Sequence, residues 1–182
     1  MKTIFSLGAM ILAIILSSCV LKVSVVNPSP NVDVPIVGGG LFLDLDDNIL
    51  NEMTIKRSGL KPMKITEWRT SLTHGFNNAF DEFQIVSSIN DANYKIFIIK
   101  AEPFYEISEG AYDAWGSRVG GSIIVQIEYQ ARMIDSDGNI IKRSTSTVSS
   151  KRSTSSVNEV PLLAESAIES MFEKIAQDFF NE

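Results

Sequence analysis

The sequence predicts an α+β domain in which a mostly antiparallel sheet of four or five strands carries two amphipathic helices on one face. Apolar residues recur at spacings of three and four in residues 65–83 and 163–179, which indicates two helices with an apolar side. Residues 122–150 alternate apolar and polar positions around a turn sequence, which indicates a hairpin with one wet face. Helices and a one-sided sheet bury each other's apolar surfaces, so both helices should pack on the same side.

The first strand and the first helix are predicted from local patterns. Residues 41–45, LFLDL, form the first strand. A looser segment with Gly59 and Pro62 precedes the helix, and Thr66 and Glu67 suit its first turn, where free amides and the positive dipole end accept oxygen atoms and negative charge. Its apolar side consists of Ile65, Trp68, Leu72, Phe76, Ala79, Phe80 and Phe83.

The remaining elements follow in chain order. Residues 84–86 predict a brief strand, and residues 94–101 are apolar on both sides, as in a strand at the centre of a sheet. Residues 135–139 supply turn chemistry before residues 140–150 return as the partner strand. Pro161 lies near the first turn of the last helix. The apolar side of that helix consists of Leu163, Ala164, Ala167, Ile168, Met171, Phe172, Ile175, Ala176 and Phe179.

The N-terminal segment has the pattern of an export signal. Lys2 precedes an uncharged run, residues 4–16, which is too short to span a bilayer because spanning takes about 20 apolar residues. Ser17 and Ser18 then precede Cys19, the sole cysteine of the chain. We therefore predict a signal peptide at residues 1–18, a lipidated N-terminus and extended tether at residues 19–35, and one domain at residues 36–182. Residues 21–26 of the tether offer a short strand.

The order Leu16, Ser17, Ser18, Cys19 resembles the lipobox of bacterial lipoproteins. The resemblance implies that the sulfur of Cys19 receives a diacylglycerol, that the signal is cut before this residue, and that acyl chains such as palmitate anchor the mature protein. Two or three chains at about 0.8 kcal/mol per buried CH₂ group give durable attachment. The other interpretation is a free cysteine that closes an ordinary signal peptide.

Composition excludes several classes of partner. The formal net charge of −6 gives a surface that does not attract nucleic acid or anionic lipid headgroups, so we expect no nucleic-acid partner and attachment to the membrane through the lipid anchor. With its one cysteine lipidated, the domain would form no internal disulfide and would depend on its core for stability.

Several polar groups invite a chemical role. Residues 142–146, KRSTS, recur as residues 151–155, and their four cations could bind an anion, although a solvated edge strand is the favoured explanation. The loops that begin at Asp44 and Asp135 lack the glycine at position six and the glutamate at position twelve of an EF-hand loop, and both favour turns. His74 is the only histidine and has no second metal ligand beside it in the sequence. We therefore expect no metal site, no cofactor, no catalytic residues and no enzymatic activity.

The segment from 102 to 121 is the candidate for binding. It reads as a long connection and carries Phe104, Tyr105, Tyr112 and Trp115 among acids and glycines. Long ordered loops are often functional, and aromatic rings supply rigid contact area at interfaces. The alternative is a loop that folds back over an open end of the core and buries its rings.

The order of elements behind the lipobox looks like that of the YajG-type outer-membrane lipoproteins. It is also similar to the auxiliary lipoproteins of lipid-trafficking ABC transport systems. The residues that carry the resemblance are the helix at 68–83, DANYKI at 91–96 and DGN at 137–139. YajG-type chains tend to have Asp-x-Arg after the first strand, whereas Asp46 is followed here by Asp47 and Asn48.

The resemblance implies a non-enzymatic lipoprotein of the cell envelope that faces the periplasm. Val20 after the lipidated cysteine points to the outer membrane, because an aspartate at that place retains such proteins in the inner membrane. We expect a binding or assembly module that docks onto a protein partner in an envelope transport or maintenance complex through its open sheet face or aromatic loop. The alternatives are a carrier of a lipid or other apolar ligand in a cavity lined by Phe76, Phe80 and Ile98, and, last, a hydrolase of envelope polymers.

Overall fold

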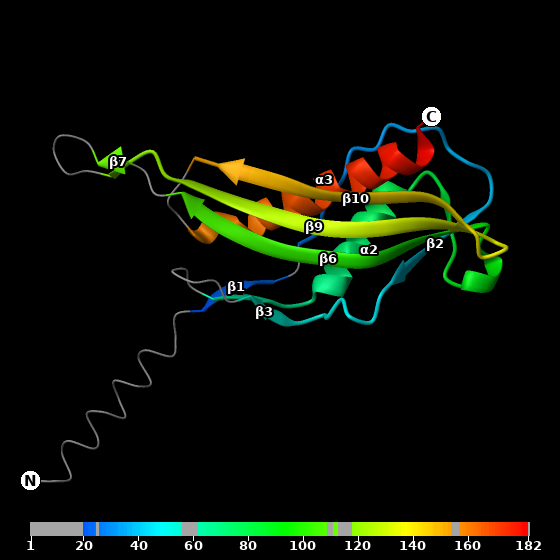
Figure 1. Cartoon of the computed structure of the whole chain (residues 1–182), viewed down its shortest axis with the longest axis horizontal. Coiled ribbons are helices and arrows are strands. Elements are labelled where there is room, and N and C mark those ends of the chain that lie inside the picture. Colours follow the sequence, from blue (N-terminus) through cyan, green and yellow to red (C-terminus); the bar gives the residue numbers. More distant parts are fainter. Residues whose placement is uncertain are drawn as a thin grey trace, which may run out of the picture.

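A five-stranded sheet forms the body of the domain, and both long helices lie on one of its faces (Figure 1). The computed structural model describes residues 20–24, 26–55, 62–108, 111–112, 118–153 and 157–181. The strand order is β10 (Ile140–Arg152), β9 (Ser122–Asp135), β6 (Tyr94–Ser108), β2 (Gly40–Leu45) and β5 (Gln84–Ile85). The predicted α+β class is confirmed.

The sheet is mixed. β9 pairs antiparallel with both β6 and β10, whereas β2 pairs parallel with β6 and β5. The parallel pairing follows from the helix α2 (Trp68–Ala79), which lies between β2 and β5 in the chain and returns it to the end where β2 began. Short elements complete the chain: η1 (Ile89–Asp91), β7 (Ala111–Tyr112), β8 (Arg118–Val119) and η2 (Val157–Glu159).

The two helices bury the predicted apolar sides against the sheet and against each other. α3 (Val160–Phe180) contacts β9, β10 and α2, and every residue predicted for its apolar side is buried. The helices approach closely at Gly75, where a Cβ atom would lie 2.8 Å from the ring of Phe172. Within the described ranges, no helix combines the length and apolar content needed to cross a bilayer.

The first helix starts later than its apolar pattern predicts. Ile65 belongs to β4 (Met63–Ile65), and Glu67 adopts the left-handed conformation, with φ 57°, without capping the helix through its side chain. The cap comes instead from Asn51, whose carbonyl accepts from Trp68 N at 2.9 Å and whose Oδ1 accepts from Arg69 N at 3.1 Å. The expectation that Thr66 and Glu67 form the first turn is therefore wrong, because a distant loop supplies the oxygen atoms.

A second sheet, of three strands, corrects the expectation of an extended tether at residues 19–35. Its order is β1 (Leu21–Val23), β4 and β3 (Met53–Ile55). Val23 is 2% exposed, and the main-chain N–H groups of Ser29 and Asn31 donate to carboxylates of α3 at 3.0 Å each. The described residues 21–24 and 26–35 are thus part of the folded domain, and β1 lies within residues 21–26, where the sequence suggested a short strand.

The central strand β6 is longer than predicted and shortens the expected loop at 102–121. It continues to Ser108 because Ala101, Pro103 and Tyr105 alternate into the core. The carbonyl of Ala101 accepts a hydrogen bond from Trp68 Nε1 at 3.0 Å and therefore points away from β9. Because backbone polar groups alternate sides along a strand, those of Pro103 and Tyr105 point to the same side as those of Ala101. In the described part of the chain β2 pairs with β6 only as far as Ile98, and the missing N–H of Pro103 therefore falls on a strand edge, where proline is tolerated.

Candidate functional site

The candidate site is the face of the five-stranded sheet that lies opposite the helices. Along β9 the odd-numbered residues 123–133 are buried beneath the helices, while the even-numbered residues 124–134 are partly exposed on the other side. No described element covers that side (Figure 1). We call it the open face. By register it comprises residues 124–134 (even) of β9, residues 143–151 (odd) of β10, Lys95, Phe97, Lys100, Glu102, Phe104 and Glu106 of β6, and Phe42 and Asp44 of β2.

Lysines on β6 neutralise acids of the open face. Lys95 lies 3.3 Å from the carboxylate of Asp44, and its ammonium is 5.5 Å from the ring centroid of Phe97. Lys100 lies 3.0 Å from both Glu128 and Glu102. Hydrogen bonds to Glu128 and then to Glu102 raise the pKa of Lys100 above its ordinary value, so it remains charged at physiological pH.

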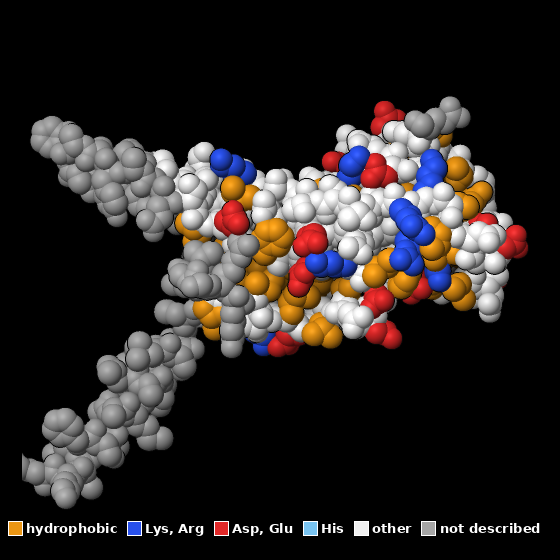
Figure 2. Space-filling model, in the orientation of Figure 1, with side chains coloured by type: hydrophobic (Ala, Val, Ile, Leu, Met, Phe, Trp, Pro, Cys, Tyr) orange, Lys and Arg blue, Asp and Glu red, His pale blue; other side chains and the backbone are white. Residues whose placement is uncertain are grey.

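Two arginines on the open face have no such neutralising partner. Arg132 of β9 and Arg143 of β10 are register partners, so they lie directly opposite each other on adjacent strands. Among the residues that the structure describes, neither guanidinium forms an ion pair or hydrogen bond. On its other side Arg132 faces Phe97 in register. Figure 2 shows Lys and Arg side chains gathered on the right of this face beside hydrophobic ones, whereas a basic side chain nearer the centre lies between acidic ones.

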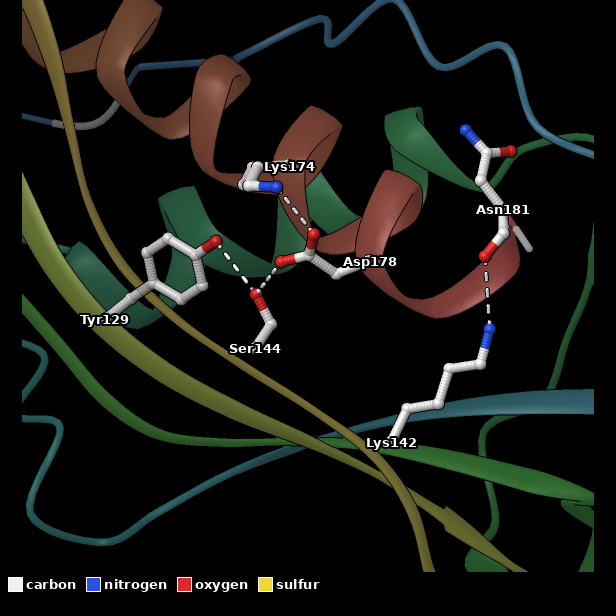
Figure 3. Close-up of polar contacts among 6 residues, drawn as sticks. All are labelled: Tyr129, Lys142, Ser144, Lys174, Asp178 and Asn181. Atoms are coloured by element: carbon white, nitrogen blue, oxygen red, sulfur yellow. Dashed lines mark hydrogen bonds and ion pairs between the residues drawn. The ribbon is translucent and has the colours of Figure 1, made fainter.

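A buried hydrogen-bond chain fixes β10 from the opposite side. Ser144, next to Arg143, is 2% exposed and donates from Oγ to the carboxylate of Asp178 on α3 at 2.6 Å. Because that bond uses its one hydrogen, Ser144 accepts from the Tyr129 hydroxyl at 2.9 Å, and Lys174 completes the chain at Asp178 (Figure 3). Burial raises the pKa of Tyr129, which keeps its hydroxyl protonated as a donor. β10 is thus pinned to α3, and Arg143 is held on the open face.

The basic repeat of β10 does not form one anion site. Side chains alternate along a strand, and so its cations divide between the two faces. Lys142 donates to the Asn181 carbonyl at 3.3 Å, and Arg152 pairs with Glu159 on the helix side. Arg143 and Lys151 belong to the open face by register. The cation that joins Arg143 is Arg132, from a strand in which the sequence showed only alternation.

The predicted aromatic residues fall in different environments. Phe104 is partly exposed on the open face, whereas Tyr105, the next residue, is 1% exposed and faces the core, where burial raises its pKa. Tyr112 belongs to β7, but its side chain lies outside the described residues, as do Trp115 and Cys19 altogether. The structure therefore adds Phe104 to the open face and does not bring the four rings together in the part that it describes.

Two of the three residues proposed to line a carrier cavity are packed in the core. Phe80 and Ile98 are 0% exposed, and the rings of Phe76 and Phe80 lie 5.2 Å apart. A groove of about 770 Å³ lies between β2 and α2, and Phe76 contributes to its lining together with other apolar side chains and with polar ones such as His74. The described ranges also contain no group of three or more His, Cys, Asp or Glu residues placed to hold a metal ion.

Comparison with known proteins shows a shared fold. No family model matches the sequence, and no curated protein matches it. A Xanthomonas campestris protein of a family of unknown function is similar in structure, with a TM-score of 0.52, 13% identity, and coverage of 86% of this chain and 91% of that chain. The minor lipoprotein of Acinetobacter baumannii has a TM-score of 0.48 and 18% identity, with coverage of 79% of this chain and 92% of that chain. Rare lipoprotein B of Shewanella oneidensis has a TM-score of 0.43 and 14% identity, with coverage of 76% of this chain and 91% of that chain.

Proposed function

We propose that this protein is a non-enzymatic lipoprotein of the bacterial cell envelope that binds a protein partner through its open face. The observation that carries the proposal is the division of the sheet into a face covered by both helices and a face that no described element covers. The open face combines arginines with the partly exposed rings of Phe97 and Phe104. Arginine and aromatic residues are the types enriched at protein interfaces.

The position of β1 supports attachment through Cys19 and defines which end of the domain lies nearest the membrane. Only Val20 separates Cys19 from Leu21, where β1 begins, so at most about 7 Å of chain joins the lipid to the three-stranded sheet. The anchor would hold that sheet close to the bilayer. The open face would then remain accessible to a partner in the same envelope.

We also propose that the protein lies at the outer membrane and has no catalytic role. Val20 supports outer-membrane placement, and the lack of a catalytic constellation in the sequence supports a role without catalysis. The proposed relatives are the YajG-type and ABC-auxiliary lipoproteins, which the order of elements resembles. The packing of Phe80 and Ile98 favours docking over the carrier alternative.

Site-specific photo-crosslinking in cells tests the docking surface. A photo-reactive amino acid replaces Thr147, exposed on the open face, or Gln177, exposed on the outer side of α3. We expect a discrete adduct with one envelope protein from position 147 and none from the control position. Equal adducts from both positions, or none from position 147, would contradict the proposed function.

A further inference from the structure

Arg132 and Arg143 place like charges opposite each other where the fold does not require charge. Like charges directly opposite on adjacent strands destabilise the ladder. The next pair of the same two strands on this face, Thr145 opposite Gln130, is neutral. The arginine pair is therefore a local cost in the isolated domain, and such costs are typical of residues kept for function.

Acids on the same face are already engaged. Asp44 pairs with Lys95, and Glu102 and Glu128 pair with Lys100. Within the described residues this leaves Arg132 and Arg143 as an unneutralised cationic pair on a chain whose net charge is −6. A partner that carries negative charge would be attracted to this pair.

We propose that Arg132 and Arg143 bind an acidic segment of the protein partner, an inference that rests on the proposed docking at the open face. Guanidinium groups bind carboxylates through paired, charge-assisted hydrogen bonds. Phe97 lies beside Arg132 in register and offers an apolar contact, so the segment carries Asp or Glu with an apolar residue nearby. The bond from Ser144 to Asp178 holds β10 in place, so Arg143 is positioned before the partner arrives.

The location of the pair favours a protein over lipid headgroups. Arg132 lies three residues before the end of β9 at Asp135, and the hairpin that follows is at the end of the long sheet opposite to β1 (Figure 1). β1 is the first described strand after Cys19, so the proposed lipid anchor would place the β1 end of the domain nearest the bilayer. The arginine pair would then lie toward the end that is farther from the lipid headgroups.

The test measures binding of a defined probe to the full-length acylated protein in detergent micelles. The probe is a fluorescein-labelled peptide of four Glu–Leu repeats, and its affinity is read by fluorescence anisotropy at several salt concentrations. We expect the double variant Arg132→Gln, Arg143→Gln to weaken binding about tenfold or more. The matched control Lys151→Gln lies on the same face of β10 at the far end and should change affinity less than about twofold.

A stability measurement separates recognition from a structural role. Because the pair is repulsive, the urea midpoint of the double variant should be equal to or above that of the wild type. A lower midpoint would overturn the inference, as would an equal loss of peptide affinity in the Lys151 control. Arginine-dependent binding to phosphatidylglycerol vesicles without binding to the peptide would overturn it in favour of headgroups.

The crosslinking experiment distinguishes this inference from the proposed function. If the adduct from position 147 persists undiminished in the Arg132→Gln, Arg143→Gln background, the acidic-segment inference fails while docking at the open face stands. If the wild-type background yields no adduct from position 147, the proposed function itself fails. A strongly reduced adduct in the variant, together with reduced peptide affinity, is the result that we expect.

Discussion

The hydroxyl of Ser144 donates a 2.6 Å hydrogen bond to the carboxylate of Asp178, joining the edge strand β10 to the last turn of α3. Tyr129, on the neighbouring strand β9, donates to the same hydroxyl at 2.9 Å. A single buried oxygen thus connects two strands and a helix. This connection fixes the strand that carries Arg143 on its other face.

Loss of this hydroxyl should destabilise the domain. We expect Ser144→Ala to lower the free energy of unfolding by about 1–3 kcal/mol, because the buried Tyr129 hydroxyl loses its acceptor and Asp178 loses a donor. Ser146 lies on the same face of β10 and is only partly buried, so Ser146→Ala should change stability by less than about 0.5 kcal/mol. Urea unfolding measures both. Equal effects of the two substitutions would show that the chain does not pin β10.

Burial of Tyr129 predicts a loss of stability in alkali. Its pKa is raised in the folded state, so above about pH 10 the unfolded chain releases the proton that the folded protein still holds. The unfolded state then binds fewer protons, so the contribution of Tyr129 to stability is constant below that pH and falls above it. Tyr129→Phe should make the fall shallower, while Tyr105, whose pKa burial also raises, retains part of it. Unfolding free energies at about pH 8 and about pH 11 measure the difference, and identical slopes would contradict the prediction.

Long periodic segments were predictable because the spacing of their apolar residues reflects which side of the element is buried. The alternation of residues 123–133 and the apolar side of α3 follow from burial against one surface. Of the three-stranded sheet only the strand near residues 21–26 was suggested by the sequence, because each of its strands has three residues, too few to show a period. The continuation of β6 past Ala101 was missed because Pro103 reads as a breaker unless the free strand edge is known.

The candidate site depended on register, which local patterns do not give. The repeat in β10 drew attention to four cations that the strand divides between two faces. Arg132 is the only cationic residue of β9, and it lies opposite Arg143 only once the two strands are paired. Of the predicted aromatic residues, Phe104 and Tyr105 are neighbours in sequence and therefore point to opposite faces of the sheet.

The unexpected cap of α2 gives a prediction about residues 51 and 67. Asn51→Ala should cost about 1 kcal/mol of unfolding free energy, because it removes the acceptor of the Arg69 main-chain N–H. Glu67 holds a left-handed conformation without a capping bond, so Glu67→Gly should leave stability unchanged or raise it. Thermal unfolding monitored by circular dichroism measures both variants. If Glu67→Gly were the more damaging of the two, the cap would not come from Asn51.

Lipid attached to Cys19 would fix the compartment, the orientation and the class of partner of this protein. The most direct measurement is the intact mass of the native protein extracted from membranes, alongside labelling of cells with a fatty-acid analogue. We predict a chain that starts at Cys19 and carries acyl groups, and a Cys19→Ala variant that takes up no label and leaves the membrane fraction while still folded. A native protein with an unmodified thiol, or with residues 1–18 still attached, would contradict the account.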